Sequence, residues 1–528
     1  MLFMLFFSNM DCVSAHLKLT DIFIALLGLF IFSSAVHWLT NKGGPMLWPV
    51  LGIIPTFLFH ATNVYDWITD ALIESGGTFR YRGMWLGGAH GVLTVDPSNI
   101  EYMLKTKFKN FPKGKYYRKR FSDLLGSGIF NADDELWRDQ RRVATSEMHS
   151  SRFIDYSLGT VQELVHGKLL KLIDNIVKSS DQRVDLQDIF LRFTFDNISI
   201  AAFGVDPGCL AINLPDVPFA EAFERATELT LFRFTVPPFL WKLLKFFNIG
   251  FEKELREAVK VVHEFAEKTV EDRMMEYEQE GHLSERTDLL SRFMEVEQYR
   301  FSMNFLRDFC ISFILAGRDT SSVALAWFFW LIHKHPHIEN KIINEVESVV
   351  SNSTHRNMND ENAMFTREQL KKMVYLQAAL SESLRLYPSV PLGFKEVQED
   401  DILPDGSMVS KGARVIYCIY SMARVESIWG KDCREFRPER WIKDGEFMSE
   451  NQFKYPVFNA GPRLCVGKRF AYTQMKMVAA SILLRYHVEV CEGQCVVPKM
   501  TTTLYMKNGL YVRFKPRVLN LVRESTEK

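Results

Sequence analysis

Apolar residues recur at helical spacing over long stretches of this chain, and only a few short runs resemble strands. The spacing predicts helices at residues 153–178, 251–280, 303–333, 337–350, 368–386 and 467–485. Strand-like runs occur at residues 91–95, 414–419 and 510–514. We therefore expect a mainly α-helical fold with a small β-sheet region.

Near the N-terminus, residues 22–39 form an apolar run without a formal charge. Its length is near the lower limit of what spans a bilayer. A cleaved signal peptide is the alternative, but its apolar stretch would be shorter and would end in small residues, whereas this run ends in bulky ones. We expect a retained anchor within residues 1–42, and Lys18 and Lys42 at its ends leave the orientation open.

A stretch rich in glycine and proline follows the anchor at residues 43–55. Such a composition resists helix formation, so we interpret the stretch as a hinge. No later change of composition marks a second boundary. Residues 56–528 are therefore expected to form one large domain.

The composition is that of a globular protein and excludes several classes of function. Hydrophobic residues make up 47% and charged residues 24% of the chain, so a large core can form. The 64 basic and 64 acidic residues give no net charge and hence no global field to hold nucleic acid. The cysteines are scattered without a C-x-x-C pair, so neither a disulfide framework nor a zinc site is indicated.

A glycine-bounded loop near the C-terminus carries the strongest chemical signal. Phe458, Gly461, Arg463, Cys465 and Gly467 stand at fixed spacing just before the last predicted helix. The glycines allow backbone amides to point at the cysteine sulfur, and the helix start lowers a thiol pKa. A buried inert thiol is the alternative, but the five positions would coincide by chance on the order of once in ten thousand chains. We predict that Cys465 is a thiolate ligand of a metal.

Two pairs of residues share faces of predicted helices. Glu382 and Arg385 lie at i, i+3 and can form an ion pair, although most such pairs are surface decoration. Trp137 and Arg141 lie four residues apart on one face of another helix. A later Phe-Arg-Pro-Glu-Arg segment ends at Arg440.

The cysteine loop and these motifs resemble those of the cytochrome P450 superfamily. The resemblance implies the P450 fold, with residues 56–528 as the catalytic domain and haem b bound through Cys465 as the axial iron ligand. It also implies a monooxygenase that uses O₂ and receives electrons from NADPH through a membrane-bound P450 reductase. The expected location is the endoplasmic reticulum membrane, with a single-pass N-terminal anchor and a cytosolic catalytic domain.

The resemblance assigns roles to further residues. Those expected to meet the haem propionates are Trp137, Arg141 and Arg463. Those expected to shape the cysteine loop are Phe458, Gly461 and Gly467. Those expected to brace the protein on the haem side are Glu382, Arg385 and Arg440.

The long apolar helix contains the sequence Ala316-Gly317-Arg318-Asp319-Thr320, which matches a further P450 motif. Small Ala316 and Gly317 would let the helix pass close to a flat cofactor. Thr320 can turn its hydroxyl inward and loosen the backbone ladder, and the adjacent Asp319 can supply protons. The alternative is an ordinary core threonine. We predict that Thr320 and Asp319 are the catalytic proton-delivery residues.

Four basic residues form a candidate surface for an acidic redox partner: Arg138, Arg142, Lys468 and Arg469. The first two are four residues apart on a helical face next to that of Trp137, and the others follow the cysteine loop. A solvated charged face without a partner is the alternative. The sequence alone does not decide between them.

Residues 202–207, 221–228 and 400–406 resemble the plant long-chain fatty-acid ω-hydroxylases, in which an acyl chain lies in an apolar channel. By position in the family, the expected channel walls are Phe121, Leu125, Ile129, Phe130, Ala316, Val390, Leu392 and Leu504. No residue is singled out as the partner of the substrate carboxylate. Residues 237–247 are bulky, apolar and dotted with lysines, which favours contact with membrane lipid, and a buried helix hairpin is the alternative.

Three other functions stay open at this point. The chain could hydroxylate another lipophilic substrate or an in-chain position. It could be a haem-thiolate isomerase or dehydratase acting on peroxides, although that chemistry does not require Asp319 and Thr320. It could also be a non-enzymatic haem sensor, which would need neither the proton relay nor a large apolar pocket.

Overall fold

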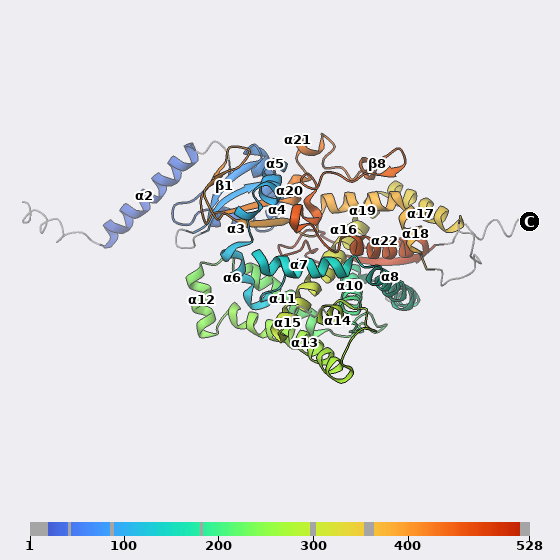
Figure 1. Ribbon diagram of the computed structural model, residues 1–528. Helices are drawn as coiled ribbons and strands as arrows, with labels where there is room; N and C mark the ends of the chain where they lie inside the picture. The colour runs from blue at the N-terminus through green and yellow to red at the C-terminus, as the bar shows by residue number, and fades with distance from the viewer. Residues whose placement is uncertain are drawn as a thin grey trace, which may run out of the picture.

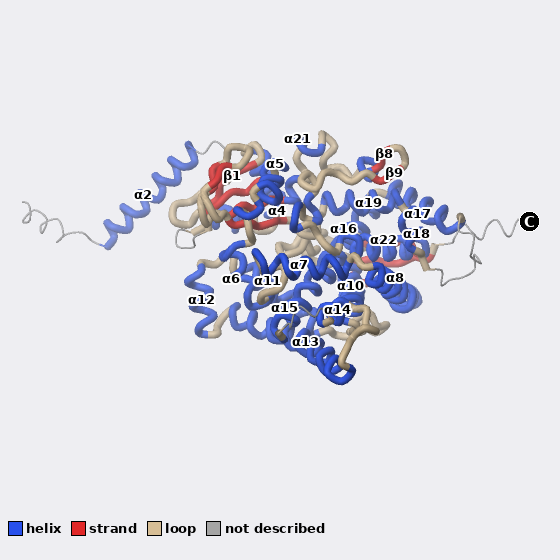
Figure 2. Tube along the Cα trace, viewed as in Figure 1, coloured by secondary structure: helices blue, strands red, loops and turns tan. Residues whose placement is uncertain are grey.

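The computed structural model describes residues 19–40, 44–84, 89–179, 183–295, 302–352 and 364–517. Helices form most of this part of the chain, and the strands gather mainly in one region next to the N-terminal helix (Figure 2). The prediction of a mainly α-helical fold with a small β-sheet region is confirmed.

The helical elements follow the order given by Figure 1. They are α2 (Leu19–Thr40), α3 (Ile54–Phe59), α4 (Val64–Glu74), α5 (Pro97–Glu101), η2 (Tyr102–Thr106), η3 (Phe108–Asn110), α6 (Gly114–Leu125), α7 (Asp134–Met148), α8 (Ser151–Leu164), η4 (Val165–Leu169), α9 (Leu170–Lys178), α10 (Leu186–Phe203), α11 (Pro218–Phe232), α12 (Pro238–Phe247), α13 (Phe251–Glu280), α14 (Leu289–Met294), α15 (Met303–Ile314), η5 (Leu315–Asp319), α16 (Thr320–Lys334), α17 (Pro336–Ser351), α18 (Arg367–Lys372), α19 (Val374–Leu386), α20 (Ile419–Met422), α21 (Glu426–Trp429), η6 (Pro438–Trp441), η7 (Pro456–Phe458), η8 (Gly461–Arg463) and α22 (Lys468–Arg485).

The strands form one sheet of four, one of three and two short hairpins. They are β1 (Thr78–Arg82), β2 (His90–Thr94), β3 (Val184–Asp185), β4 (Leu392–Glu396), β5 (Asp401–Ile402), β6 (Met408–Val409), β7 (Arg414–Cys418), β8 (Ile442–Lys443), β9 (Glu446–Phe447), β10 (Tyr486–Val490) and β11 (Tyr511–Pro516). The four-stranded sheet has the order β1-β2-β7-β4, and only the β2–β7 pair is parallel. The three-stranded sheet has the order β10-β11-β3.

The run α15–η5–α16 crosses the middle of the molecule. Helices α10 and α19 pack against α16, and α13 packs against α15. Most side chains of α16 are fully buried because its apolar residues occupy every face. This central run positions the Ala316–Thr320 motif inside the protein.

Most of the predicted elements are present. The helix predicted at residues 251–280 coincides with α13, and those at 337–350 and 467–485 correspond to α17 and α22. The helix predicted at 368–386 is wrong in one respect, since Met373 separates α18 from α19. The predicted strands at 91–95, 414–419 and 510–514 correspond to β2, β7 and β11.

Within the described residues, two helices are long and apolar enough to cross a membrane, at Thr20–Leu39 and Met303–Lys334. The second is a core helix because most of it is buried. The first is exposed along almost its whole length, which is compatible with a membrane anchor. The division into residues 1–42, 43–55 and 56–528 stays a prediction, and residues 1–18 and 41–43 lie outside the described residues.

Candidate active site

The loop around Cys465 is fixed by backbone hydrogen bonds and by one required glycine. The Cys465 N–H donates to the Phe458 carbonyl at 2.8 Å, and the Leu464 N–H donates to the Gly461 carbonyl at 3.0 Å. Gly461 has a φ of +59°, and a Cβ there would lie 2.2 Å from the Leu104 carbonyl oxygen. No other residue type fits that position without a backbone shift.

Burial raises the pKa of the Cys465 thiol overall, although three neighbouring groups act in the opposite direction. The Gly467 N–H, Arg141 and Lys468 each lower the pKa and so favour the ionised form. The side chain is nevertheless accessible to solvent, so a ligand can reach the sulfur. Helix α22 begins at Lys468 and turns its positive N-terminal end toward this loop. The arrangement suits a thiolate metal ligand.

Arg463 lies beside Trp137, with its guanidinium 4.4 Å from the centre of the indole ring. Its Nη2 donates to Asp133 Oδ1 at 2.7 Å and to the Ala132 carbonyl at 3.1 Å. Its Nε is buried and has no hydrogen-bond partner among the described residues. The structure therefore brings together the predicted pair Trp137 and Arg463, and it adds Asp133, which the sequence did not indicate.

A buried lysine next to Arg463 was missed by the sequence analysis. Lys395 on β4 is 1% exposed, and its Nζ has no partner among the described residues. Burial and the like charges of Arg463 and Lys113 hold the pKa of Lys395 well below its usual range. No strand was predicted at residues 392–396, and no sequence pattern there indicates that Lys395 faces the interior.

These donors fit haem b, which carries two carboxylates on one edge of a flat ring. Lys395 Nζ and Arg463 Nε are buried donors that lack acceptors among the described residues, and leaving a buried donor unsatisfied is costly. Two propionates would supply these acceptors, while Cys465 would provide the thiolate for the iron. The prediction that Arg141 also meets a propionate stays a prediction. Burial lowers the pKa of Arg141, and the nearby Cys465 acts against that shift.

Thr320 begins α16 just after the π-helical turn η5, where the regular hydrogen-bond ladder is interrupted. Its Oγ1 donates to the Ala316 carbonyl at 2.5 Å, as expected for a hydroxyl that loosens the ladder. A Cβ at Gly317 would strike the Ile198 side chain of α10 at 2.5 Å, so Gly317 is required for close packing against α10. The role of Ala316 and Gly317 beside a cofactor stays a prediction.

Asp319 is fully buried and paired with its neighbour. Its Oδ1 accepts a hydrogen bond from Arg318 Nη1 at 2.6 Å, and the same Nη1 lies 3.4 Å from the Tyr505 hydroxyl. Burial raises the pKa of Asp319, whereas Arg318 and Tyr505 lower it. Tyr505 lies far away in the sequence, so no local pattern could have placed it beside the carboxylate.

Glu382, Arg385 and Arg440 form a buried network. Arg385 donates to both oxygens of Glu382, at 2.7 and 2.8 Å, and Arg440 Nε donates to Oε1 at 3.0 Å. Trp441 Nε1 adds a bond to Oε2 at 2.9 Å. Arg385 also holds three backbone carbonyls on the segment before η6, so the network ties α19 to the region that precedes the cysteine loop.

The predicted reductase-docking residues differ in exposure. Arg138 and Arg142 are exposed on α7 and form short-range ion pairs with Glu135 and Asp139. Arg469 is exposed, whereas Lys468 is half-buried beside Cys465. Their role in docking stays a prediction.

The predicted channel walls also differ in exposure. Phe121, Leu125 and Leu504 are buried, and Val390 is 36% exposed. The remaining four are half-buried: Ile129, Phe130, Ala316 and Leu392. Contact with a substrate stays a prediction for all eight.

The site combines a cysteine loop, buried cationic side chains that suit two carboxylates, and a hydroxyl in an interrupted central helix. This combination is that of a haem-thiolate oxygenase. The family model "Cytochrome P450" matches residues 43–514. The chain belongs to the cytochrome P450 family, whose members bind haem b and use electrons from NADPH supplied through a reductase.

The related proteins are plant enzymes of this family. The chain is 51% identical to "Cytochrome P450 86B1" of Arabidopsis thaliana over 92% of this chain and 88% of that protein. It is 37% identical to "Alkane hydroxylase MAH1" of the same plant, over 90% and 95%. It is 35% identical to "Noroxomaritidine synthase 1" of Narcissus pseudonarcissus, over 94% and 96%. Overall similarity therefore shows the family, whereas the substrate has to be inferred from the residues of the site.

Replacing Thr320 with alanine is expected to uncouple NADPH use from product formation. The variant loses the hydroxyl at the interrupted turn but retains the core around α16. Because positioned proton transfer contributes roughly 10²–10⁴-fold, the ratio of product to NADPH should fall by at least about tenfold. Product and NADPH are measured in the same reaction.

The matched control is Ser322→Ala. The Ser322 hydroxyl donates the same kind of bond, to the Arg318 carbonyl at 2.8 Å, two residues further along the helix. Its removal should leave the ratio unchanged. An unaltered ratio in Thr320→Ala would contradict the proton-delivery role.

Proposed function

We propose that this P450 monooxygenase hydroxylates long-chain fatty acids at or near the terminal methyl. The observation that carries the proposal is an aromatic cluster beside the predicted channel wall. The Tyr117 and Phe121 rings stack at 4.5 Å, and Phe234 and Phe394 complete the cluster at 5.7–6.3 Å. Residues from α6, the segment after α11 and β4 thus offer a continuous apolar surface for an alkyl chain.

The names of the relatives support an alkyl substrate only in part. One relative is named an alkane hydroxylase, which fits an unbranched hydrocarbon chain. A relative of similar identity is named for a different product, so the support from names is limited. The resemblance of residues 202–207, 221–228 and 400–406 to fatty-acid ω-hydroxylases is the more specific argument.

The residues divide the work as follows. When bound, the haem iron supplies the oxygen activation. Cys465 would hold the iron through its sulfur, and the Gly467 N–H would stabilise the negative charge there. Burial raises the pKa of the Asp319 carboxyl, which suits it to exchanging a proton, and Thr320 offers a hydroxyl one residue further on. A terminal C–H bond is less reactive than its neighbours, so the channel must select it by position.

The location we propose is the endoplasmic reticulum membrane, with the catalytic domain in the cytosol. Helix α12 supports a second membrane contact besides α2, because its apolar side chains point outward: Phe239, Leu240, Leu243, Phe246 and Phe247. The alternative of a buried hairpin at residues 237–247 is wrong, since only Trp241 of α12 is buried. Helices α2 and α12 lie at the same side of the molecule in Figure 1.

The test is incubation of membranes containing the enzyme and a P450 reductase with saturated fatty acids of different chain length. We expect NADPH-dependent hydroxylation at or near the methyl end, located by mass spectrometry. The matched control is the Cys465→Ser enzyme in the same membranes. Absence of an NADPH-dependent product across the panel would refute the fatty-acid proposal, and in-chain products alone would refute terminal selectivity.

A further inference from the structure

Arg120 on α6 is a buried cation with an unused hydrogen-bond donor. Its side chain is 3% exposed. Nε donates to the Arg233 carbonyl and Nη1 to the Tyr116 carbonyl, each at 3.1 Å. Nη2 is buried and has no partner among the described residues. A guanidinium in this position is expected to have an acceptor, because a buried N–H without one is costly.

No carboxylate is among the main electrostatic influences on Arg120. These come from Tyr116, Tyr81, Arg233 and Arg414, of which two are further cations. Burial lowers the pKa of Arg120 to about 10, so the side chain is still charged at neutral pH. Within the part of the chain that the structure describes, a positive charge is therefore held inside the protein without an ion-pair partner.

The neighbouring Arg233 shows what a satisfied buried arginine looks like in this protein. It pairs with Glu252 at 2.6 Å and with Asp123 at 2.7 Å. Arg414 differs again, since it lies opposite Glu396 in the β4–β7 register and bonds to the Tyr81 hydroxyl. Arg120 has no such acid among the described residues, so we expect a ligand to supply the missing acceptor.

The surroundings of Arg120 suit one end of an amphiphile. Its guanidinium lies 3.4 Å from the centre of the Tyr116 ring and 5.2 Å from that of Phe234. Phe234 belongs to the aromatic cluster that also contains Tyr117 and Phe121. The guanidinium of Arg120 thus lies next to the aromatic cluster. Phe121, a predicted channel-wall residue, is its neighbour in the sequence.

We propose that the Arg120 guanidinium binds the carboxylate of the fatty-acid substrate, whose alkyl chain then follows the aromatic cluster. This inference rests on the proposed function and names the residue that fixes the polar end. With that end held, chain length decides which carbon reaches the Cys465 side of the site. Selectivity for the methyl end follows from the distance rather than from reactivity.

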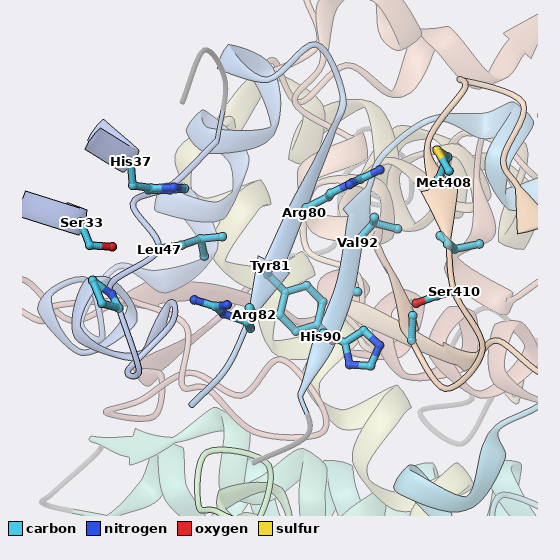
Figure 3. Close-up of a pocket in the computed structure, with 14 residues that line it drawn as sticks. Ser33, His37, Leu47, Arg80, Tyr81, Arg82, His90, Val92, Met408 and Ser410 are labelled. Atoms are coloured by element: carbon cyan, nitrogen blue, oxygen red, sulfur yellow. The ribbon is translucent and has the colours of Figure 1, made fainter. Parts of the chain in front are cut away.

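The rival position for a carboxylate is the pocket in Figure 3, which lies between α2 and the β1–β2 hairpin. Its volume is about 500 Å³, and the exposed Arg80 and Arg82 line it. Both arginines stand in solvent, where an ion pair gains little. Tyr81 lines the same pocket and bonds to Arg414, so the pocket adjoins the Arg120 region from outside.

The experiment compares a saturated fatty acid with the primary alcohol of the same chain length, by titrating the haem-loaded full chain in detergent micelles. Wild type should bind the acid more tightly than the alcohol. In Arg120→Gln this preference should fall roughly 10- to 100-fold, as expected for a lost bond between charged groups, while the alcohol affinity stays the same. Arg120→Lys should retain part of the preference for the acid. Lysine keeps the positive charge but lacks the paired N–H donors of the planar guanidinium.

Arg82→Gln is the matched control, since it removes the same charge from the outer pocket. It should keep the wild-type preference. Loss of preference in Arg82→Gln, or an unchanged preference in Arg120→Gln, would overturn the inference. If Arg120→Gln does not fold, Arg120→Lys is the deciding variant. If Arg120→Lys prefers the acid over the alcohol as strongly as wild type does, the inference is overturned.

The inference and the proposed function can fail separately. If wild type hydroxylates fatty acids but binds acid and alcohol equally, Arg120 does not hold the carboxylate and the proposed function stands. If wild type neither binds nor hydroxylates fatty acids, the proposed function falls and the inference falls with it.

Discussion

Replacing Cys465 with serine is expected to abolish the red-shifted absorption of the reduced carbon monoxide complex. A serine hydroxyl stays protonated at neutral pH, so it cannot replace a thiolate that the Gly467 N–H and Arg141 help to stabilise. NADPH-dependent product should fall by more than about a hundredfold, since the axial thiolate promotes O–O cleavage. Spectra of the reduced protein with and without carbon monoxide provide the measurement.

Cys495→Ser is the matched control for this prediction. Cys495 is an exposed free cysteine near the C-terminal end of the described chain. The substitution should leave the red-shifted band and the activity intact. Persistence of that band in Cys465→Ser would show that another residue binds the iron.

The second large effect is expected at Glu382, where alanine should strongly destabilise the fold. Glu382 accepts bonds from two buried arginines and from the Trp441 indole. Its removal leaves Arg385 and Arg440 without their main counter-charge, which costs about 3–5 kcal/mol. Since native domains are stable by only about 5–15 kcal/mol, the yield of folded protein should fall sharply.

The control for Glu382→Ala comes from the same network region. Glu439 lies in η6 beside Arg440 but pairs outward with the exposed Lys341 at 2.6 Å. A surface pair of this kind contributes about 1 kcal/mol or less, so Glu439→Ala should unfold close to wild type. Denaturant unfolding of all three proteins provides the comparison, and equal stability of Glu382→Ala and wild type would refute the bracing role.

Local sequence patterns predicted much of the fold because helices satisfy their backbone hydrogen bonds within one segment. The apolar spacing of residues 251–280 is visible without any knowledge of the neighbours, and α13 has those bounds. The break at Met373 was missed because periodicity continues across it. The sequence predicted a loosened ladder at Thr320, whose hydroxyl competes for a backbone carbonyl, but it did not predict that the ladder is interrupted as the π-helical turn η5.

The candidate site was predicted only where its residues belong to short motifs. Cys465, Glu382 and Thr320 each stand in such a motif, and their surroundings match it. Lys395 and Arg120 were missed because their significance lies in an absent partner, which emerges only when distant segments pack together. No spacing along the chain reports that a buried donor lacks an acceptor.

The attachment of α2 has a consequence for how the enzyme meets its substrate. Phe30, Ser34 and His37 form a half-buried stripe on α2, and the Phe30 ring stacks on Trp48 of the body at 6.2 Å. The helix proposed as the anchor therefore contacts the domain through this stripe, and a membrane that held α2 would also constrain how the domain lies over it. The fatty acid proposed as substrate partitions into a bilayer, so on the proposed membrane location the enzyme would sample it in two dimensions. Its Michaelis constant is then properly a mole fraction in lipid rather than a concentration in water.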